Sequence, residues 1–151
     1  MRKARRMIRP YNDTDLDELL EAWYSASLLG HQFLDEAFFQ RERNSIREVY
    51  LPNAETWVFE QDGVVVGFIA LIGNEVGAIF VDSNYHGRGI GRALMDHARS
   101  IREFLELFVF KDNKVGGDFY ERYGFHQVGE ELHEETGFMQ LRLRLNCPAC
   151  S

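Results

Sequence analysis

A short run near the middle of the chain could bind a phosphate group. It spans residues 86–92 and contains three glycines and two arginines: Gly87, Gly89, Gly91, Arg88 and Arg92. Glycine lets a backbone approach a ligand closely because it carries no Cβ atom. Arginine donates charge-assisted hydrogen bonds that suit phosphate oxygens. The composition of this run therefore favours an anion site.

The elements that must position this run support the same interpretation. The apolar segment 76–81 precedes it and is typical of a buried strand, and a helical pattern follows to about Ile101. The first N–H groups of a helix lack intrahelical partners, and the helix dipole favours negative charge there by about 0.3–1 kcal/mol. A strand, a glycine-rich turn and a helix N-terminus together predict a pyrophosphate site.

The glycine spacing excludes two common phosphate-binding motifs. A P-loop requires G-x-x-x-x-G-K-(S/T), and no lysine follows these glycines. The dinucleotide motif G-x-G-x-x-G fails because Arg92 stands where the third glycine would fall. That motif also needs an acidic residue about 20 residues further on, at the end of a second strand, to bind a ribose, and the next predicted strand, residues 105–110, ends in Lys111 instead.

A second run, residues 113–125, has a pattern of its own. It reads N-K-V-G-G-D-F-Y-E-R-Y-G-F, and its centre predicts a helix. Gly116 lies inside that helix and costs it up to ~1 kcal/mol relative to alanine. Tyr120 either completes the apolar face of the helix or presents its hydroxyl group to a reaction.

Both runs resemble motifs of the GNAT acetyltransferases. Residues 86–91 are similar to the acetyl-CoA-binding pattern (Q/R)-x-x-G-x-(G/A), with His86 at a position that usually holds glutamine or arginine. Residues 113–125 are similar to N-x-x-A-x-x-F-Y-x-x-x-G-F, with Gly116 in place of alanine. The resemblance implies that acetyl-CoA is the co-substrate, and that His86 makes a weaker or pH-dependent contact with its phosphates.

The resemblance also assigns roles to single residues. Those expected to bind the cofactor are Phe80, Val81, His86, Gly87, Arg88, Gly89, Ile90, Gly91, Arg92, Asn113 and Tyr120. Asn113 is expected near the pantetheine arm, and Tyr120 beside the thioester sulfur. A backbone N–H near Phe80 or Val81 is expected to stabilise the oxyanion of the reaction.

The chemistry sets demands on the acceptor side. A lysine amine with a pKa near 10.4 is uncharged in about one of a few thousand molecules at pH 7, so a base is useful. Glu75, at the start of the strand before the glycine-rich turn, is the first candidate, and a solvated strand-end carboxylate is an equal interpretation. His31 is the second candidate, because the resemblance places its segment on the acceptor side. We expect His31, Phe33 and Glu75 to bind the acceptor.

The leaving sulfur needs a proton or a hydrogen bond. Tyrosine has a reference pKa near 10 and a thiol one near 8.5, so full proton transfer from Tyr120 is uphill by roughly 2 kcal/mol. Tyr120 is therefore expected to act as a catalytic residue mainly through hydrogen bonding, with Glu75 as the catalytic base.

Length and composition agree with one compact enzyme domain. The chain has 151 residues, 45% of them hydrophobic, which suits a single core and argues against disorder. Its net charge of −7 argues against nucleic acid as a partner. The longest apolar stretch, residues 64–72, is shorter than the ~18 residues of a membrane span, and the basic opening residues are not followed by a signal-peptide core. We expect a cytoplasmic monomer or homodimer that binds neither nucleic acid nor membrane.

The two cysteines lie near the C-terminus as Cys147-Pro-Ala-Cys150. A redox pair favours the N-terminus of a helix, and a zinc site needs two further ligands, which the histidine spacing does not offer. We expect no metal site and a frayed tail over residues 146–151. The domain is expected at residues 7–145, after a basic extension of residues 1–6.

The alternating patterns predict an α/β (α+β) fold with a mixed sheet of six to seven strands and about four helices. Strands are expected near residues 7–11, 56–60, 64–72, 75–81, 105–110, 125–132 and 139–145. Helices are expected near residues 14–30, 35–50, 90–101 and 115–123. The order β-α-α-β-β-β-α-β-α-β-β resembles that of the GNAT fold. Residues 30–34, 50–58 and 124–126 resemble a group of small bacterial GNAT enzymes that acetylate protein lysines.

These observations predict an N-acetyltransferase that transfers the acetyl group of acetyl-CoA to a primary amine by direct attack in a ternary complex. The resemblance implies a protein lysine as the acceptor. A small amine or a polyamine is an alternative, since an acidic chain attracts any cationic amine. A CoA-binding sensor without turnover is a further alternative, but such a module has no need of Tyr120.

Overall fold

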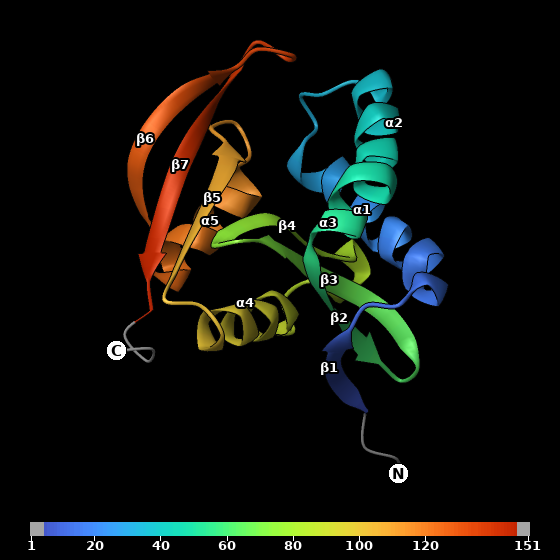
Figure 1. Cartoon of the computed structure of the whole chain (residues 1–151). Coiled ribbons are helices and arrows are strands. Elements are labelled where there is room, and N and C mark those ends of the chain that lie inside the picture. Colours follow the sequence, from blue (N-terminus) through green and yellow to red (C-terminus); the bar gives the residue numbers. More distant parts are fainter. Residues whose placement is uncertain (1–4, 148–151) are drawn as a thin grey trace.

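Seven strands form one mixed sheet in the computed structural model, which describes residues 5–147 (Figure 1). The strands are β1 (Arg6–Pro10), β2 (Glu55–Gln61), β3 (Val64–Ile72), β4 (Glu75–Val81), β5 (Phe104–Phe110), β6 (His126–His133) and β7 (Phe138–Asn146). Their order across the sheet is β1-β2-β3-β4-β5-β7-β6. Neighbouring strands are antiparallel except β4 and β5, which run parallel.

Tight turns explain why the central strands pair in chain order. Asp62 and Gly63 have φ angles of 53° and 86° in the β2–β3 turn, and Gly73 has a φ of 59° in the β3–β4 turn. Left-handed residues of this kind suit the twist of a two-strand hairpin. With neighbours on both sides and helices on both faces, β3 is buried from Val65 to Leu71, as its unbroken apolar sequence predicts.

Four helices of ten residues or more cover the sheet within the described residues (Figure 1). On one face, α1 (Leu16–Gly30) and α2 (Glu36–Ser45) pack through Leu19, Trp23 and Phe38 in a core cluster that contains Phe68 of β3. On the other face, α4 (Ile90–Ser100) and α5 (Lys114–Tyr123) pack in a second cluster. The predicted fold class is confirmed, with the number of strands fixed at seven.

The helix predicted near residues 35–50 is shorter than expected. It ends at Ser45 and continues as a π-helical turn, η2 (Ile46–Tyr50), and a single turn, α3 (Leu51–Asn53). Leu51 N–H donates to the Ile46 carbonyl, five residues back. Pro52 accounts for the change, because proline has no N–H to donate and its ring clashes with the carbonyl of residue i−4 in a regular helix.

Strands β4 and β5 are registered at one residue pair only, Glu75 with Glu106, and then diverge. Beyond that pair, the β4 edge that faces β5 has no partner strand among residues 5–147. β4 also contains a bulge, since Ala70 pairs with Ala78 whereas Leu71 pairs with Val76, leaving Gly77 as the extra residue. A bulge of this kind shifts which side chains share a face of the strand.

The ends of the domain differ from the expected boundaries. β1 begins at Arg6. Asp62 N–H donates to the Arg5 carbonyl, and Arg5 N–H donates to the Asp62 side chain, so the last residues of the expected extension belong to the sheet. Cys147, expected in a frayed tail, is buried at 4% exposure, and its N–H donates to the Glu103 carbonyl. The tail prediction is therefore wrong for this residue, because β7 continues into the core; Cys150 lies outside the described residues. No helix within residues 5–147 has both the length and the apolar character of a membrane span.

Candidate active site

A cleft of about 770 Å³ lies between β4 and β5 and is lined by every residue of β4 from Glu75 to Val81. Helix α5, the loop before α4 and the end of α1 supply other walls. Strands β4 and β5 diverge after the Glu75–Glu106 pair. The backbone groups on this edge of β4 therefore face the cleft and not a neighbouring strand of the described sheet. An unpaired strand edge offers N–H and C=O groups to any extended ligand beside it.

The glycine-rich run forms one end of the cleft. Gly87 and Gly89 have φ angles of 77° and 79°, and a Cβ at either position would meet no atom within 4 Å, so both face open space. Gly89 is the N-cap of α4, and no side chain in the described part of the chain caps this helix. The first N–H groups of α4 are therefore left for a ligand, and the glycine conformation agrees with close approach of a phosphate. The residues fit the diphosphate of CoA.

Three basic side chains, His86, Arg88 and Arg92, belong to the run at this end of the cleft, and each is placed differently. His86 donates from Nε2 to the Val81 carbonyl at 2.7 Å, which ties the turn to the end of β4. Its Nδ1 can then donate to a phosphate only in the protonated imidazolium form. Arg92 lines the cleft, whereas Arg88 does not and lies over the Tyr85 ring, 5.0 Å from its centroid.

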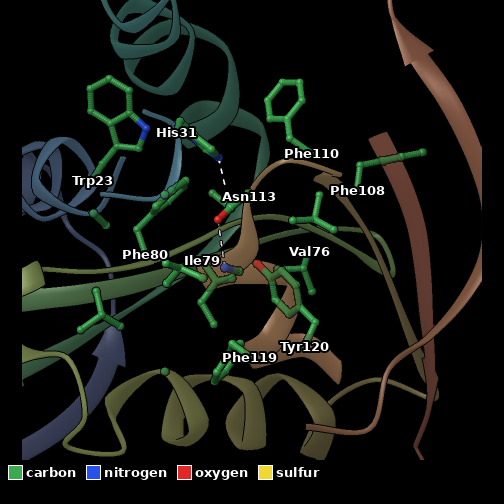
Figure 2. Close-up of a pocket in the computed structure, with 18 of the residues that line it drawn as sticks. Trp23, His31, Val76, Ile79, Phe80, Phe108, Phe110, Asn113, Phe119 and Tyr120 are labelled. Atoms are coloured by element: carbon green, nitrogen blue, oxygen red, sulfur yellow. Dashed lines mark hydrogen bonds between the residues drawn. The ribbon is translucent and has the colours of Figure 1, made fainter. Parts of the chain in front are cut away.

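A hydrogen-bond chain joins the end of α1 to the start of α5 (Figure 2). Asn113 accepts from Gly116 N–H through Oδ1 at 2.9 Å, so its Nδ2 faces His31 Nε2 at 3.3 Å. An amide nitrogen can only donate, so Nε2 of His31 accepts and the imidazole is neutral with its proton on Nδ1. Burial lowers the pKa of His31 to about 4. A nitrogen that is already engaged and weakly basic makes His31 a poor candidate for the base.

Tyr120 projects from α5 into the middle of the cleft, beside Asn113 and near Val76 and Ile79 of β4 (Figure 2). Its hydroxyl group has no hydrogen-bond partner among residues 5–147, and burial of the phenol raises its pKa above the usual value of 10. The ring packs against Phe119 and Phe125 at centroid distances of 5.4 and 5.7 Å. Tyr120 is thus a rigidly held, protonated donor that faces the cleft.

The other end of the cleft is acidic. Glu75 lines it from β4, and Glu42 and Tyr50 line it from α2 and η2. Burial raises the pKa of Glu42, and the negative charge of Glu135 adds to that effect. Burial also raises the pKa of Tyr50, with further contributions from Glu42 and Glu75, which places both carboxylates within electrostatic range of this phenol.

The structure gathers most of the predicted site residues in this cleft. Those that line it are Glu75, Phe80, Val81, His86, Gly87, Gly89, Ile90, Gly91, Arg92, Asn113, Tyr120 and His31. Phe33 lies behind His31 and packs against Phe110 and Phe138, so it supports the wall without lining it. Sequence reasoning missed Glu42 and Tyr50. One signal in the sequence could have found them: Phe38, Glu42, Ile46 and Tyr50 are four residues apart, a spacing that places them near one face of a helix.

Comparisons with known proteins agree with this geometry. Residues 52–127 match the acetyltransferase (GNAT) domain. Over 131 residues the chain is 34% identical to the peptidyl-lysine N-acetyltransferase YiaC of Escherichia coli (strain K12), covering 86% of this chain and 90% of that protein. Over 131 residues it is 30% identical to the peptidyl-lysine N-acetyltransferase YjaB of the same strain, covering 86% and 88%.

Solved structures of similar proteins share the fold. The solution structure of apo-form YjaB from Escherichia coli superposes with a TM-score of 0.83 at 28% identity, covering 93% of this chain and 97% of that chain. The PaiA N-acetyltransferase of Thermoplasma acidophilum, solved in complex with coenzyme A, has a TM-score of 0.75 at 20% identity, covering 94% and 99%. The predicted fold and family are confirmed, and the chain belongs to the GNAT family as an N-acetyltransferase that uses acetyl-CoA.

Proposed function

We propose that this enzyme acetylates the side-chain amine of a lysine in a protein or peptide. One observation carries the proposal: a single cleft along β4 has an anion-binding turn at one end and two carboxylates at the other, with the Tyr120 hydroxyl group between them. The six steps from Glu75 to Val81 span about 20 Å of strand, which leaves room for an extended thioester arm. The names of the two curated relatives, both peptidyl-lysine N-acetyltransferases, support the same acceptor.

Each end of the cleft has a defined task in this proposal. The turn at residues 86–92 and the N-terminus of α4 hold the phosphates, and the open edge of β4 holds the pantetheine arm. Acetyl-CoA, when bound, supplies an activated acetyl thioester. The neutral amine attacks the thioester carbonyl carbon, the carbon–sulfur bond breaks, the acetyl group remains on the nitrogen, and the proton that the nitrogen then loses passes to the departing thiolate.

Two residues handle the protons of this transfer. Glu75 takes a proton from the incoming ammonium group, directly or through water, because only the neutral amine has a lone pair for attack. Tyr120 donates a hydrogen bond to the sulfur as it leaves. Since burial raises the pKa of Tyr120, the phenol keeps its proton and stabilises the sulfur chiefly by hydrogen bonding.

The experiment is an acceptor screen with acetyl-CoA. Lysine-containing peptides with blocked N-termini, peptides with a free N-terminus only, and a panel of small amines and polyamines are assayed for release of the CoA thiol. Acetyl-lysine detected by mass spectrometry on the blocked peptides is the expected result. Turnover limited to small amines would replace the lysine proposal with the alternative acceptor, and CoA binding without any turnover would favour a sensor.

A further inference from the structure

Glu42 occupies an unusual position in α2. Four residues at a spacing of four, Phe38, Glu42, Ile46 and Tyr50, all line the cleft. Phe38 and Ile46 are buried at 5% and 3% exposure, so Glu42 is the one charged residue in an otherwise apolar and aromatic stripe. A charge placed against the local hydrophobic pattern costs stability, and such conflicts are expected at functional positions.

The π-helical turn brings the two polar members of the stripe together. In a regular α-helix, residues eight apart lie about 80° from one another around the axis. The wider turn at residues 46–50 rotates each residue by less than an α-helix does, which returns Tyr50 towards the side of Glu42. The Tyr50 ring packs close to Gly77, where an added Cβ would lie 3.7 Å from Tyr50 Cδ1.

The bulge at Gly77 turns Glu75 towards the same side. Val76 packs with Ile79 and Val81 in the core cluster of α4 and α5, whereas Ala78 and Phe80 pack in the cluster of α1 and α2. Without the bulge, the alternation of side chains would place Val76 with Ala78 and Phe80 instead. The shift puts Glu75, which precedes Val76, on the side where α2 carries Glu42.

The Glu42 carboxylate forms no ion pair with a cation among residues 5–147. The charge of Arg41 lowers the pKa of Glu42, but this effect is smaller than the opposing one of burial, and the Arg41 guanidinium pairs with Glu135 at 2.6 Å. Arg43 lies over the Tyr24 ring, 5.7 Å from its centroid. The cost of desolvating Glu42 is therefore only partly compensated, and a cationic ligand would supply further compensation.

A second polar group in the same cleft lacks a hydrogen-bond partner within the described residues. The Tyr120 hydroxyl group points into the cleft from the opposite wall and has no hydrogen-bond partner within the described residues (Figure 2). The cleft therefore presents an unpartnered donor at its centre and an unpartnered acceptor at its acidic end. The thioester sulfur would accept a hydrogen bond from Tyr120, and the cationic group of an amine acceptor that reaches the thioester would satisfy Glu42.

We propose that Glu42 binds the ammonium group of the acceptor and selects long aliphatic amines, with Phe38 and Ile46 packing against the methylene chain. This proposal rests on the proposed transfer to lysine. Glu42 orients the amine by a charge-assisted hydrogen bond, and Glu75 takes the proton. The side chain of lysine has both required parts, an apolar stem and a cationic head. A free N-terminus has no such stem.

The test compares Glu42→Gln with Glu48→Gln. Glu48 is exposed, lies in the same helical segment outside the cleft lining, and loses the same charge on substitution. We expect Glu42→Gln to raise KM for a lysine peptide tenfold or more and to leave KM for acetyl-CoA unchanged. The melting temperature should be the same as in the wild type or higher. Glu48→Gln should behave as the wild type. A merely structural role of Glu42 predicts instead a lower melting temperature and an unchanged KM for the peptide.

A second acceptor distinguishes charge recognition from general damage. In a peptide with an aminooxy group in place of the lysine amine, the nucleophile is uncharged at neutral pH, so Glu42→Gln should leave its KM within twofold of the wild-type value. Equal effects on both peptides, or no effect on the lysine peptide, would overturn the role of Glu42 while lysine acetylation itself stood. Failure of the wild-type enzyme to acetylate any lysine peptide would refute the proposed function. In that case, the role of Glu42 can still be tested by titrating the CoA-bound protein with the same lysine peptide. The proposal requires that the Glu42→Gln variant bind this peptide more weakly than the wild type does.

Discussion

At the scale of single residues, the active site depends on keeping two ionisable side chains uncharged. Burial raises the pKa of Tyr120 and lowers that of His31, so both are neutral near pH 7. In the proposed mechanism, Tyr120 then retains a proton to share with the leaving sulfur; His31 retains the lone pair that accepts from Asn113. A neutral His31 also avoids repelling the cationic acceptor.

The Tyr120→Phe variant removes one hydroxyl group and preserves the ring that packs against Phe119 and Phe125. We expect kcat to fall tenfold or more, which corresponds to at least ~1.4 kcal/mol of transition-state stabilisation. KM for acetyl-CoA should change little, because the hydroxyl group acts on the sulfur only as it leaves. Steady-state kinetics with a lysine peptide measure both values. A wild-type kcat would reduce Tyr120 to a packing residue.

The lowered pKa of His31 predicts a pH dependence of stability. The pKa of His31 is near 6.5 in the unfolded chain and about 4 in the folded protein. Between these pH values His31 is protonated only in the unfolded chain, so the free energy of unfolding falls as the pH falls from about 6.5 to 4. The slope from His31 is at most ~1.4 kcal/mol per pH unit, and less because the ring is partly accessible. Urea unfolding at pH 7, 6 and 5 should show a shallower decline for His31→Gln than for the wild type. Parallel declines would contradict the assignment of a neutral His31.

At the scale of elements, the sequence predicted strands and turns better than it predicted the irregular segments. Strand β3 and strand β4 begin and end where expected: positive-φ glycines, Gly63 and Gly73, bound the apolar run of β3, and β4 begins after Gly73 and ends before the polar residues 82–84. The bulge at Gly77 was not predicted, since it depends on how β4 pairs with β3, and Pro52 marked the end of a helix without indicating the π turn at residues 46–50 before it. The cofactor end of the cleft comes from one local motif and was predicted. The acidic end combines α2 with β4, so Glu42 was missed.

The glycine-rich turn gives a test at this scale. Gly89→Val places a β-branched residue at a φ of 79° and fills the space where the N-terminus of α4 meets the phosphates, so we expect CoA affinity to fall at least tenfold. Gly63→Val is the matched control, because Gly63 has a φ of 86° and equally open surroundings in the β2–β3 turn. Both variants carry similar backbone strain, and only Gly89→Val should weaken binding in a calorimetric titration. Equal CoA affinities in the two folded variants would exclude the turn as the phosphate site.

At the scale of the whole molecule, the cleft separates two parts of the sheet that share a core cluster but are joined by strand pairing at one position only. Strands β1–β4 meet β5–β7 through the single registered pair Glu75–Glu106. Beyond the acidic end, Arg41 pairs with Glu135 in the β6–β7 turn, and the Phe33 and Phe138 rings lie 4.9 Å apart. A ligand that fills the cleft contacts both parts and supplies hydrogen bonds where the sheet has none.

Cofactor binding should therefore stabilise the whole fold and not only the turn. At a CoA concentration one hundred times the dissociation constant, linkage predicts about 2.7 kcal/mol of added stability. For a domain of this size, that corresponds to a melting temperature raised by roughly 5–10 °C. Hydrogen exchange should slow at the amides of residues 76–81 that face the cleft, since the open edge of β4 gains partners, whereas the β2–β3 turn should be unaffected. Protection confined to residues 86–92 at saturating CoA would mean that the ligand contacts the turn alone and leaves the edge of β4 open.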